Sequence, residues 1–251
     1  MSDRSISELC SEAETRSRAH VWRLGACAAL CATLMFAIAL PARAQVDEDQ
    51  LGAWYMYFLN AKFDDSQWGI QGDVQYRAWD LGSDMEQLLL RGGITWRPKS
   101  DDVMFTLGYA NITSGAPGDS SKTSNESRAY QEALLPQKVG SRVLLTHRFR
   151  FEQRWVENQD FRTRFRYGLF MNVPLNRTDL KKGAWYMALY NELFINGQRD
   201  IGDGREVELF DRNRFYAGIG RSLTDRSRVQ FGYMHQYTDN FAKGQLQLSL
   251  H

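Results

Sequence analysis

Hydrophobic and polar residues alternate with a period of two along much of the chain after residue 50. In Arg148–Trp155, arginines and one glutamate occupy every second position, and aromatic residues fill most positions between them. The segment Phe161–Phe170 repeats this pattern. Because successive side chains of a β-strand point to opposite faces, a period of two predicts strands with one charged face and one aromatic face.

The same alternation, interrupted by turn-forming clusters, predicts eleven strands and an all-β fold. No proline lies inside any of these segments, which agrees with a strand assignment. Glu126–Leu135 is ambiguous, since one helical turn within a long loop also fits it. The segments are Leu51–Phe63, Trp68–Trp79, Gln87–Arg97, Val103–Ile112, Glu126–Leu135, Arg142–Trp155, Phe161–Val173, Ala184–Asn196, Phe210–Gly220, Arg228–Thr238 and Gly244–His251.

Short and long connections between these segments fall on opposite sides of the predicted sheet. Thr113–Asn125 and Gly197–Glu208 are long and polar, whereas four short turns lie on the other side. This is the pattern of an antiparallel transmembrane β-barrel of the outer membrane. Bacterial barrels normally contain an even number of strands, so we expect 10–12 strands, with 12 as the best value. A soluble β-sandwich is the alternative fold.

Tryptophan positions favour the membrane barrel over the sandwich. Six tryptophans lie within a few residues of a predicted strand end, where aromatic girdles of membrane barrels occur. They are Trp54, Trp68, Trp79, Trp96, Trp155 and Trp185.

The first 44 residues have the features of a secretory signal peptide. Leu24–Leu40 is an uncharged and mostly apolar run, and Ala42–Ala44 provides a small-x-small cleavage site. All three cysteines lie in this segment, so disulfides and zinc–thiolate sites are excluded after cleavage. The predicted organisation is a signal peptide at residues 1–44 and an outer-membrane barrel at residues 45–251.

Charge in the predicted barrel domain is balanced but rich in arginine. Without the five cations and four acids of the first 44 residues, 26 residues of each sign remain, and 19 of the cations are arginine. This balance gives no case for nucleic acid as a partner. Arginine suits buried, hydrogen-bonded charge. We therefore expect a charge network in the lumen formed by Arg148, Arg150, Glu152, Arg154, Arg162, Arg164, Arg166, Glu192, Arg212 and Arg214. Asn191, Asp211 and Asn213 fall on the lipid-facing parity, so they lie beyond the membrane edge or a bulge shifts the register.

Three functions remain open from the residues alone. The first is a structural barrel whose lumen is filled by an Arg/Glu network. The second is a narrow anion-selective pore, or a binder of an acidic ligand, with a small anion as its partner. The third is a lipid-modifying enzyme that uses His147 or His235, although no convincing catalytic constellation, metal cluster or cofactor motif is visible. We therefore expect no enzyme activity, no metal and no cofactor.

A set of short motifs resembles a known family. RFRFEQR (Arg148–Arg154), NELF (Asn191–Phe194), FDRNR (Phe210–Arg214) and GYMHQ (Gly232–Gln236) follow in this order after the signal peptide. Together they resemble the domain-of-unknown-function 2490 family, a group of Gram-negative proteins regarded as outer-membrane β-barrels with no assigned activity. The resemblance implies an outer-membrane location, but no reaction. The expected partners are outer-membrane lipid and, during biogenesis, the barrel-insertion machinery.

Overall fold

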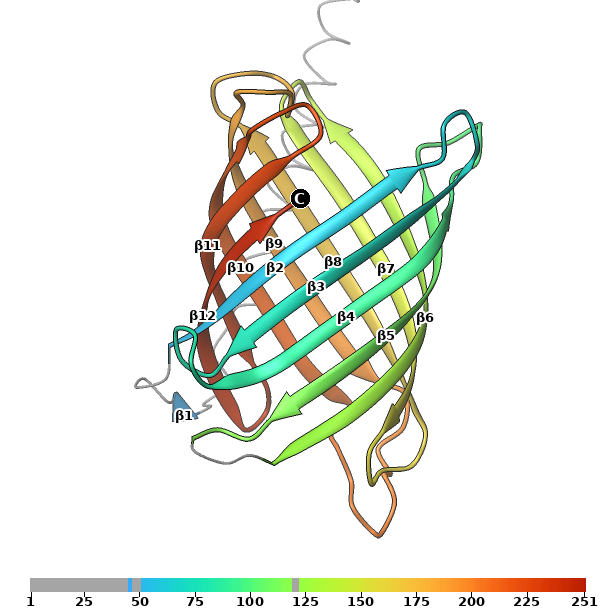
Figure 1. Ribbon diagram of the computed structural model, residues 1–251, viewed down its shortest axis with the longest axis vertical. Coiled ribbons are helices and arrows are strands. Elements are labelled where there is room, and N and C mark those ends of the chain that lie inside the picture. Colours follow the sequence, from blue (N-terminus) through green and yellow to red (C-terminus); the bar gives the residue numbers. More distant parts are fainter. Residues whose placement is uncertain (1–44, 47–50, 119–121) are drawn as a thin grey trace, which may run out of the picture. The chain divides into compact units, whose positions relative to one another are not determined.

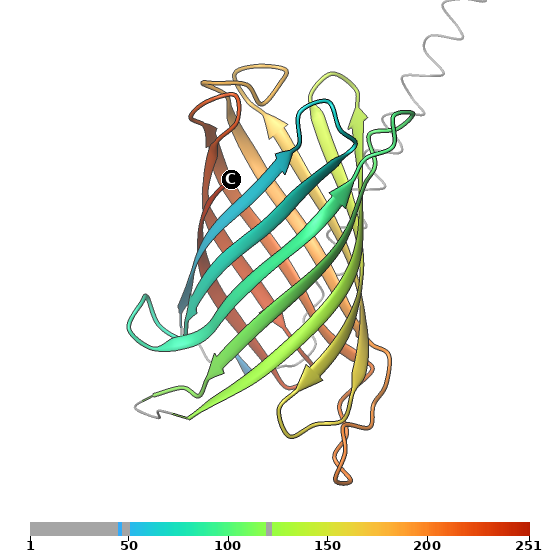
Figure 2. The same cartoon turned by 45° about the vertical axis from the view of Figure 1, so that its right-hand side comes forward.

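The structure is a computed structural model that describes residues 45–46, 51–118 and 122–251. The predicted signal peptide lies outside the described residues. All described strands belong to one compact unit, Ala42–His251. They form an antiparallel meander that is closed into a barrel by one parallel pair, β12 with β2 (Figures 1 and 2). The strands of the wall are β2 (Gly52–Lys62), β3 (Trp68–Ala78), β4 (Met85–Trp96), β5 (Met104–Gly115), β6 (Thr123–Val139), β7 (Val143–Val156), β8 (Arg162–Pro174), β9 (Trp185–Asn196), β10 (Phe210–Ser222), β11 (Arg228–Tyr237) and β12 (Phe241–Leu250).

The described wall contains eleven strands, so the best value of 12 was wrong. β12 pairs with β2 in parallel, from Gln245 opposite Gly52 to Leu250 opposite Tyr57. An even number is required only when every neighbouring pair is antiparallel, and one parallel pair permits an odd number. The two-residue strand β1 (Gln45–Val46) also pairs with β12 in parallel, ahead of β2 along the same edge. It therefore adds no strand to the wall.

The eleven predicted segments correspond to β2–β12, and the ambiguous Glu126–Leu135 lies within β6. The expectation that strands contain no proline was wrong at two positions, Pro174 at the end of β8 and Pro136 within β6. β5 pairs with β6 only as far as Leu134, so Pro136 has a strand neighbour on one side alone, opposite Thr146 of β7. A proline, which cannot donate a backbone hydrogen bond, is tolerated at such an edge.

The outer face of the wall is apolar and the inner face is polar and charged. Large apolar side chains on the outer face are exposed, such as Leu107 at 64% and Phe231 at 56%. The inner face carries the buried glutamines, arginines and glutamates. Within the described ranges, no helix is long and apolar enough to cross a membrane.

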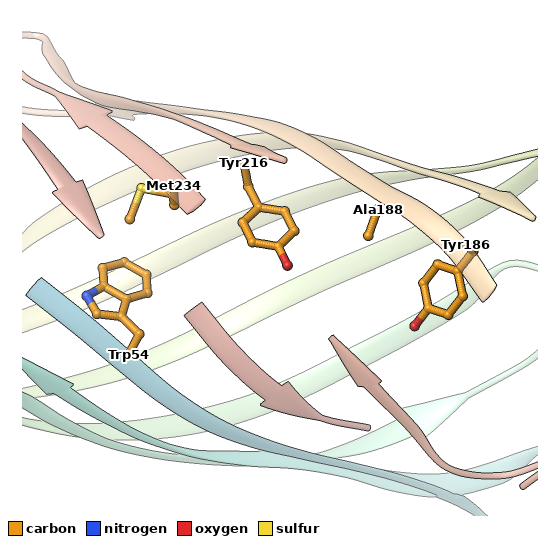
Figure 3. Packing of buried hydrophobic residues seen from close by; sticks show 5 residues of the cluster. All are labelled: Trp54, Tyr186, Ala188, Tyr216 and Met234. Atoms are coloured by element: carbon orange, nitrogen blue, oxygen red, sulfur yellow. The ribbon is translucent and has the colours of Figure 1, made fainter. Parts of the chain in front are cut away.

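Three of the six tryptophans expected at the girdles, Trp68, Trp155 and Trp185, are exposed near strand ends. Trp54 is not at a girdle, because its side chain is 3% exposed and points into the barrel (Figure 3). The strand β2 is apolar on nearly both faces, so its alternation could not show which set of side chains points inward. Two arginine side chains in contact with the indole ring explain its position.

Candidate functional site: the charged lumen

Strand register brings the arginines of β7 and β8 directly opposite one another. Arg150 lies opposite Arg166, and Arg154 lies opposite Arg162. Like charges directly opposite across a sheet destabilise it. Carboxylates placed between such arginines relieve this repulsion.

Glu152 of β7 supplies the central carboxylate. Its oxygens accept hydrogen bonds from Arg164 and Arg166 at 2.6 Å each, and Arg150 and Arg128 lie 3.8 and 4.0 Å away. The glutamate is 1% exposed. One buried carboxylate thus compensates guanidinium groups from three neighbouring strands, β6, β7 and β8.

Four further carboxylates extend this network across the lumen. Glu126 accepts hydrogen bonds from Arg128 at 2.6 Å and from Arg154 at 2.5 Å. Glu132 lies 2.5 Å from Arg150.

On the other side of the network, Glu192 of β9 accepts hydrogen bonds from Arg148 and Arg166 at 2.6 Å each. Asp211 accepts one from Arg164 at 2.8 Å and another from Arg212 at 3.2 Å.

We call this connected set the ionic network. Its arginines all come from β6, β7, β8 and β10, and its carboxylates alternate with them. It consists of Arg128, Arg148, Arg150, Arg154, Arg164, Arg166, Arg212, Glu126, Glu132, Glu152, Glu192 and Asp211.

Two of the lumen residues expected from the sequence lie outside the ionic network. Arg162 and Arg214 are both buried, but neither forms an ion pair with a carboxylate among the described residues. The structure brings the other eight together, namely Arg148, Arg150, Glu152, Arg154, Arg164, Arg166, Glu192 and Arg212.

The network also contains residues that sequence reasoning did not commit to. Glu126, Arg128 and Glu132 depend on the ambiguous segment being a strand, which it is. Asp211 lies at a register shift between Phe210 and Arg212, and this irregularity lets its carboxylate reach Arg164 despite its outward parity. The sequence signal for this bulge was the outward parity of Asp211 beside Arg212 and Arg214, which have inward parity.

A cavity of about 570 Å³ occupies part of the lumen beside the ionic network. Cations dominate its lining, with eight arginines and three carboxylates. The arginines are Arg77, Arg91, Arg148, Arg150, Arg166, Arg214, Arg226 and Arg228, and the carboxylates are Asp73, Glu132 and Glu192. Arg91 is neutralised separately by Asp73, through hydrogen bonds of 2.9 and 3.0 Å.

Trp54 connects this cavity to a buried aromatic cluster. The ring belongs to a cluster with Tyr186, Ala188, Tyr216 and Met234 (Figure 3), so side chains of β2, β9, β10 and β11 meet inside the barrel. The guanidinium carbons of two arginines that lack ion pairs, Arg77 and Arg214, lie 3.7 and 4.8 Å from the indole centroid. The indole Nε1–H donates to Glu86 at 3.4 Å, so both guanidinium groups contact the face of a ring whose edge meets a carboxylate, and cation–π contact adds to this stabilisation.

Potential catalytic groups are dispersed. His147 is hydrogen-bonded to the Tyr167 hydroxyl at 2.9 Å and to Gln137 at 3.2 Å, in exposed positions. His251 stacks on Phe58 and contacts the Ser249 hydroxyl at 2.9 Å. In the part of the chain that the structure describes, no group of three His, Cys, Asp or Glu residues could hold a metal ion.

The fold and the lumen define a closed β-barrel with an apolar exterior and an arginine-rich interior. The family described as "protein of unknown function (DUF2490)" matches residues 51–247, and the chain belongs to it. An uncharacterized protein of Methylorubrum extorquens is 30% identical over 175 residues, which cover 68% of this chain and 72% of the relative. No solved structure matches. The chain thus belongs to a family described as of unknown function.

Proposed function

We propose that this protein is an outer-membrane β-barrel, exported through a cleaved signal peptide, whose lumen is closed by the ionic network. In this role the outer face contacts lipid and the barrel does not conduct ions. The protein inserts by way of the cellular barrel-insertion machinery and carries out no reaction. The observation that carries the proposal is one connected network of seven arginines and five carboxylates inside the wall, nine of which are buried.

The outer face supports a lipid environment. Aromatic and aliphatic side chains on neighbouring strands are exposed together, for example Leu90 at 46%, Ile94 at 59% and Tyr109 at 55%. Exposed apolar surface on this scale is unfavourable in water and marks an interaction surface. A closed wall leaves few unpaired backbone groups, which is what a bilayer requires.

The network supports a closed lumen. Most of its guanidinium groups are within hydrogen-bonding distance of a carboxylate from another strand, such as Arg166 on β8 with Glu192 on β9. An ion that passes through this region would have to separate buried ion pairs. Breaking one such pair costs about 3–5 kcal/mol. The alternative of an anion-selective pore rests on the excess of arginine in the cavity lining.

Single-channel recording of the refolded protein in a planar bilayer tests this proposal. Residues 45–251 are refolded, and heat-dependent electrophoretic migration shows that the barrel is folded and inserted. We expect no steady conductance steps in a salt gradient. Steady anion-selective steps would establish the pore instead, and a protein that stays folded in buffer without detergent or lipid would overturn the membrane assignment.

A further inference from the structure

The cavity beside the ionic network contains a buried cation that the protein does not satisfy. Arg214 is 6% exposed, and its Nε donates a hydrogen bond of 2.7 Å to the side-chain oxygen of Gln236. Its two terminal nitrogens form no hydrogen bond with any described residue. A guanidinium carries five donors, so most of the donor capacity of Arg214 is unused.

Four other arginines around the cavity are neutralised by carboxylates. Arg91 is neutralised by Asp73, Arg150 by Glu132, and both Arg148 and Arg166 by Glu192. Arg226 and Arg228 also line the cavity and form no ion pair with a described carboxylate, but both are more exposed than Arg214. Among the cavity arginines that lack an ion pair, Arg77 and Arg214 are therefore the buried ones.

A second arginine lies close to Arg214, on the same aromatic ring. Arg77 donates to the side-chain oxygens of Gln75 and Gln87, at 2.7 and 2.8 Å, and its Nε has no hydrogen-bond partner. Both guanidinium groups contact the indole of Trp54. Neither guanidinium forms an ion pair with a described carboxylate, and Glu86 meets the same indole only at its Nε1–H, at 3.4 Å. A bound anion would stabilise two adjacent arginines in this arrangement.

Apolar side chains adjoin the two arginines in the same cavity. Met56, Phe170, Ala188 and Tyr216 line it together with Arg214. The volume of about 570 Å³ is within the range of small-molecule sites. Such sites combine mainly apolar walls with a few polar groups that fix the orientation of the ligand.

We propose that this cavity binds a small organic anion with an aromatic body and one carboxylate or phosphate group. The acidic group is held by Arg214, with Arg77 close by, and the aromatic body packs against Met56, Phe170 and Tyr216. This inference deepens the proposed function and rests on it in one respect. If the lumen is closed, the cavity is a binding site and not a segment of a conducting channel.

Isothermal titration of the folded barrel in detergent micelles tests the site. The probes are benzoate, phenyl phosphate and inorganic phosphate. We expect saturable binding of benzoate or phenyl phosphate with a stoichiometry of one, and the tighter of the two identifies the acidic group. The absence of binding by both aromatic probes would overturn the inference, as would inorganic phosphate binding as tightly as either of them.

Matched variants locate the binding. Arg214→Gln should weaken it by at least about tenfold, since a charge-assisted pair is lost. Arg177→Gln removes an exposed arginine that pairs with Asp179 and does not line the cavity, so it should leave the affinity unchanged. Equal effects of the two variants would contradict the assignment.

A cavity-filling variant keeps the test decisive if Arg214→Gln fails to fold. Met56→Trp leaves both arginines in place and occupies the space of the aromatic body, so it should abolish binding; unchanged binding would overturn the proposed position. Titration in micelles does not depend on conductance. A conducting barrel that binds benzoate would refute only the closed lumen, and a silent barrel that binds neither aromatic probe would refute only the site.

Discussion

Two groups of buried arginines lie in the same lumen and differ in what neutralises them. In the β6–β8 region, Arg150 and Arg166 are held by glutamates at 2.5 and 2.6 Å. On β3 and β10, Arg77 and Arg214 contact amide oxygens and the face of Trp54. Both groups are almost completely buried. Burial and strand parity alone therefore do not determine whether a lumen arginine is a structural element or a binding group.

The partner of each arginine makes the difference. A buried ion pair costs a great deal when one member is removed, because the other charge is left uncompensated. A buried cation without an anion is already uncompensated, so its removal relieves repulsion and desolvation. Substitutions in each region test whether the two groups of arginines differ in this way.

The largest effect is expected from Glu152→Gln in the ionic network. Glu152 compensates Arg164 and Arg166 directly at 2.6 Å, and the amide leaves both cations without their shared charge. The free energy of unfolding should fall by about 3–5 kcal/mol. Urea unfolding of the barrel in lipid vesicles, followed by tryptophan fluorescence, measures this.

Glu206→Gln is the matched control for this change. Its carboxylate pairs with Arg199 at 3.3 Å, and both side chains are more than half exposed. Exposed pairs contribute little, so the change should stay within about 0.5 kcal/mol. A similar loss for Glu152→Gln and Glu206→Gln would show that the network does not stabilise the barrel.

A smaller effect is expected from Trp54→Phe in the other region. The phenyl ring keeps an apolar group against Tyr216 and Met234, but it offers Arg77 and Arg214 a weaker cation–π partner. We expect a loss of about 1–2 kcal/mol in the free energy of unfolding. Trp54→Phe is also made in a chain that carries Arg214→Met. If it lowers the free energy of unfolding there as much as in the unmodified chain, the contact between Arg214 and the indole contributes nothing to stability.

The smallest effect on stability is expected from replacing Asp80, a carboxylate that is not paired with an arginine. Asp80, in the exposed loop between β3 and β4, accepts hydrogen bonds from the backbone N–H groups of Gly82, Ser83 and Asp84 at 2.9–3.0 Å and from the Ser83 hydroxyl. The Ser83 hydroxyl, followed by these N–H groups, holds the pKa of Asp80 well below its usual range.

Because this pKa is lower in the folded state, the ionised carboxylate stabilises the loop at neutral pH, and the contribution disappears as the pH falls through the folded-state value. Asp80→Asn should therefore lower the urea midpoint slightly at pH 7. The difference should shrink once the pH is below the unfolded-state value of about 4. A difference that grows on acidification would contradict this explanation.

Much of the wall was predictable because it follows from local periodicity. The period of two places Arg148, Arg150 and Arg164 on one strand face without knowledge of their neighbours. The strand number was not predictable in this way, since the parallel pairing of β12 with β2 joins the two ends of the meander. Closure is a non-local property that no segment of the sequence encodes by itself.

The composition of the site was predictable only in part. The carboxylates Glu126 and Glu132 lie on a segment whose local pattern fits two conformations, and Asp211 lies inside through a register irregularity. The inward orientation of Trp54 depends on two arginines from β3 and β10. These features arise from contacts between strands distant in sequence, which residue alternation cannot reveal.

The most direct test compares Arg166→Met with Arg214→Met by urea unfolding under identical conditions. Methionine keeps much of the apolar side chain and removes the charge. Arg166→Met should lower the free energy of unfolding by about 3–5 kcal/mol, because Glu152 and Glu192 lose a shared partner, whereas Arg214→Met should change it by less than about 1 kcal/mol or raise it. Equal losses for the two variants would contradict the division of the lumen into neutralised and available arginines.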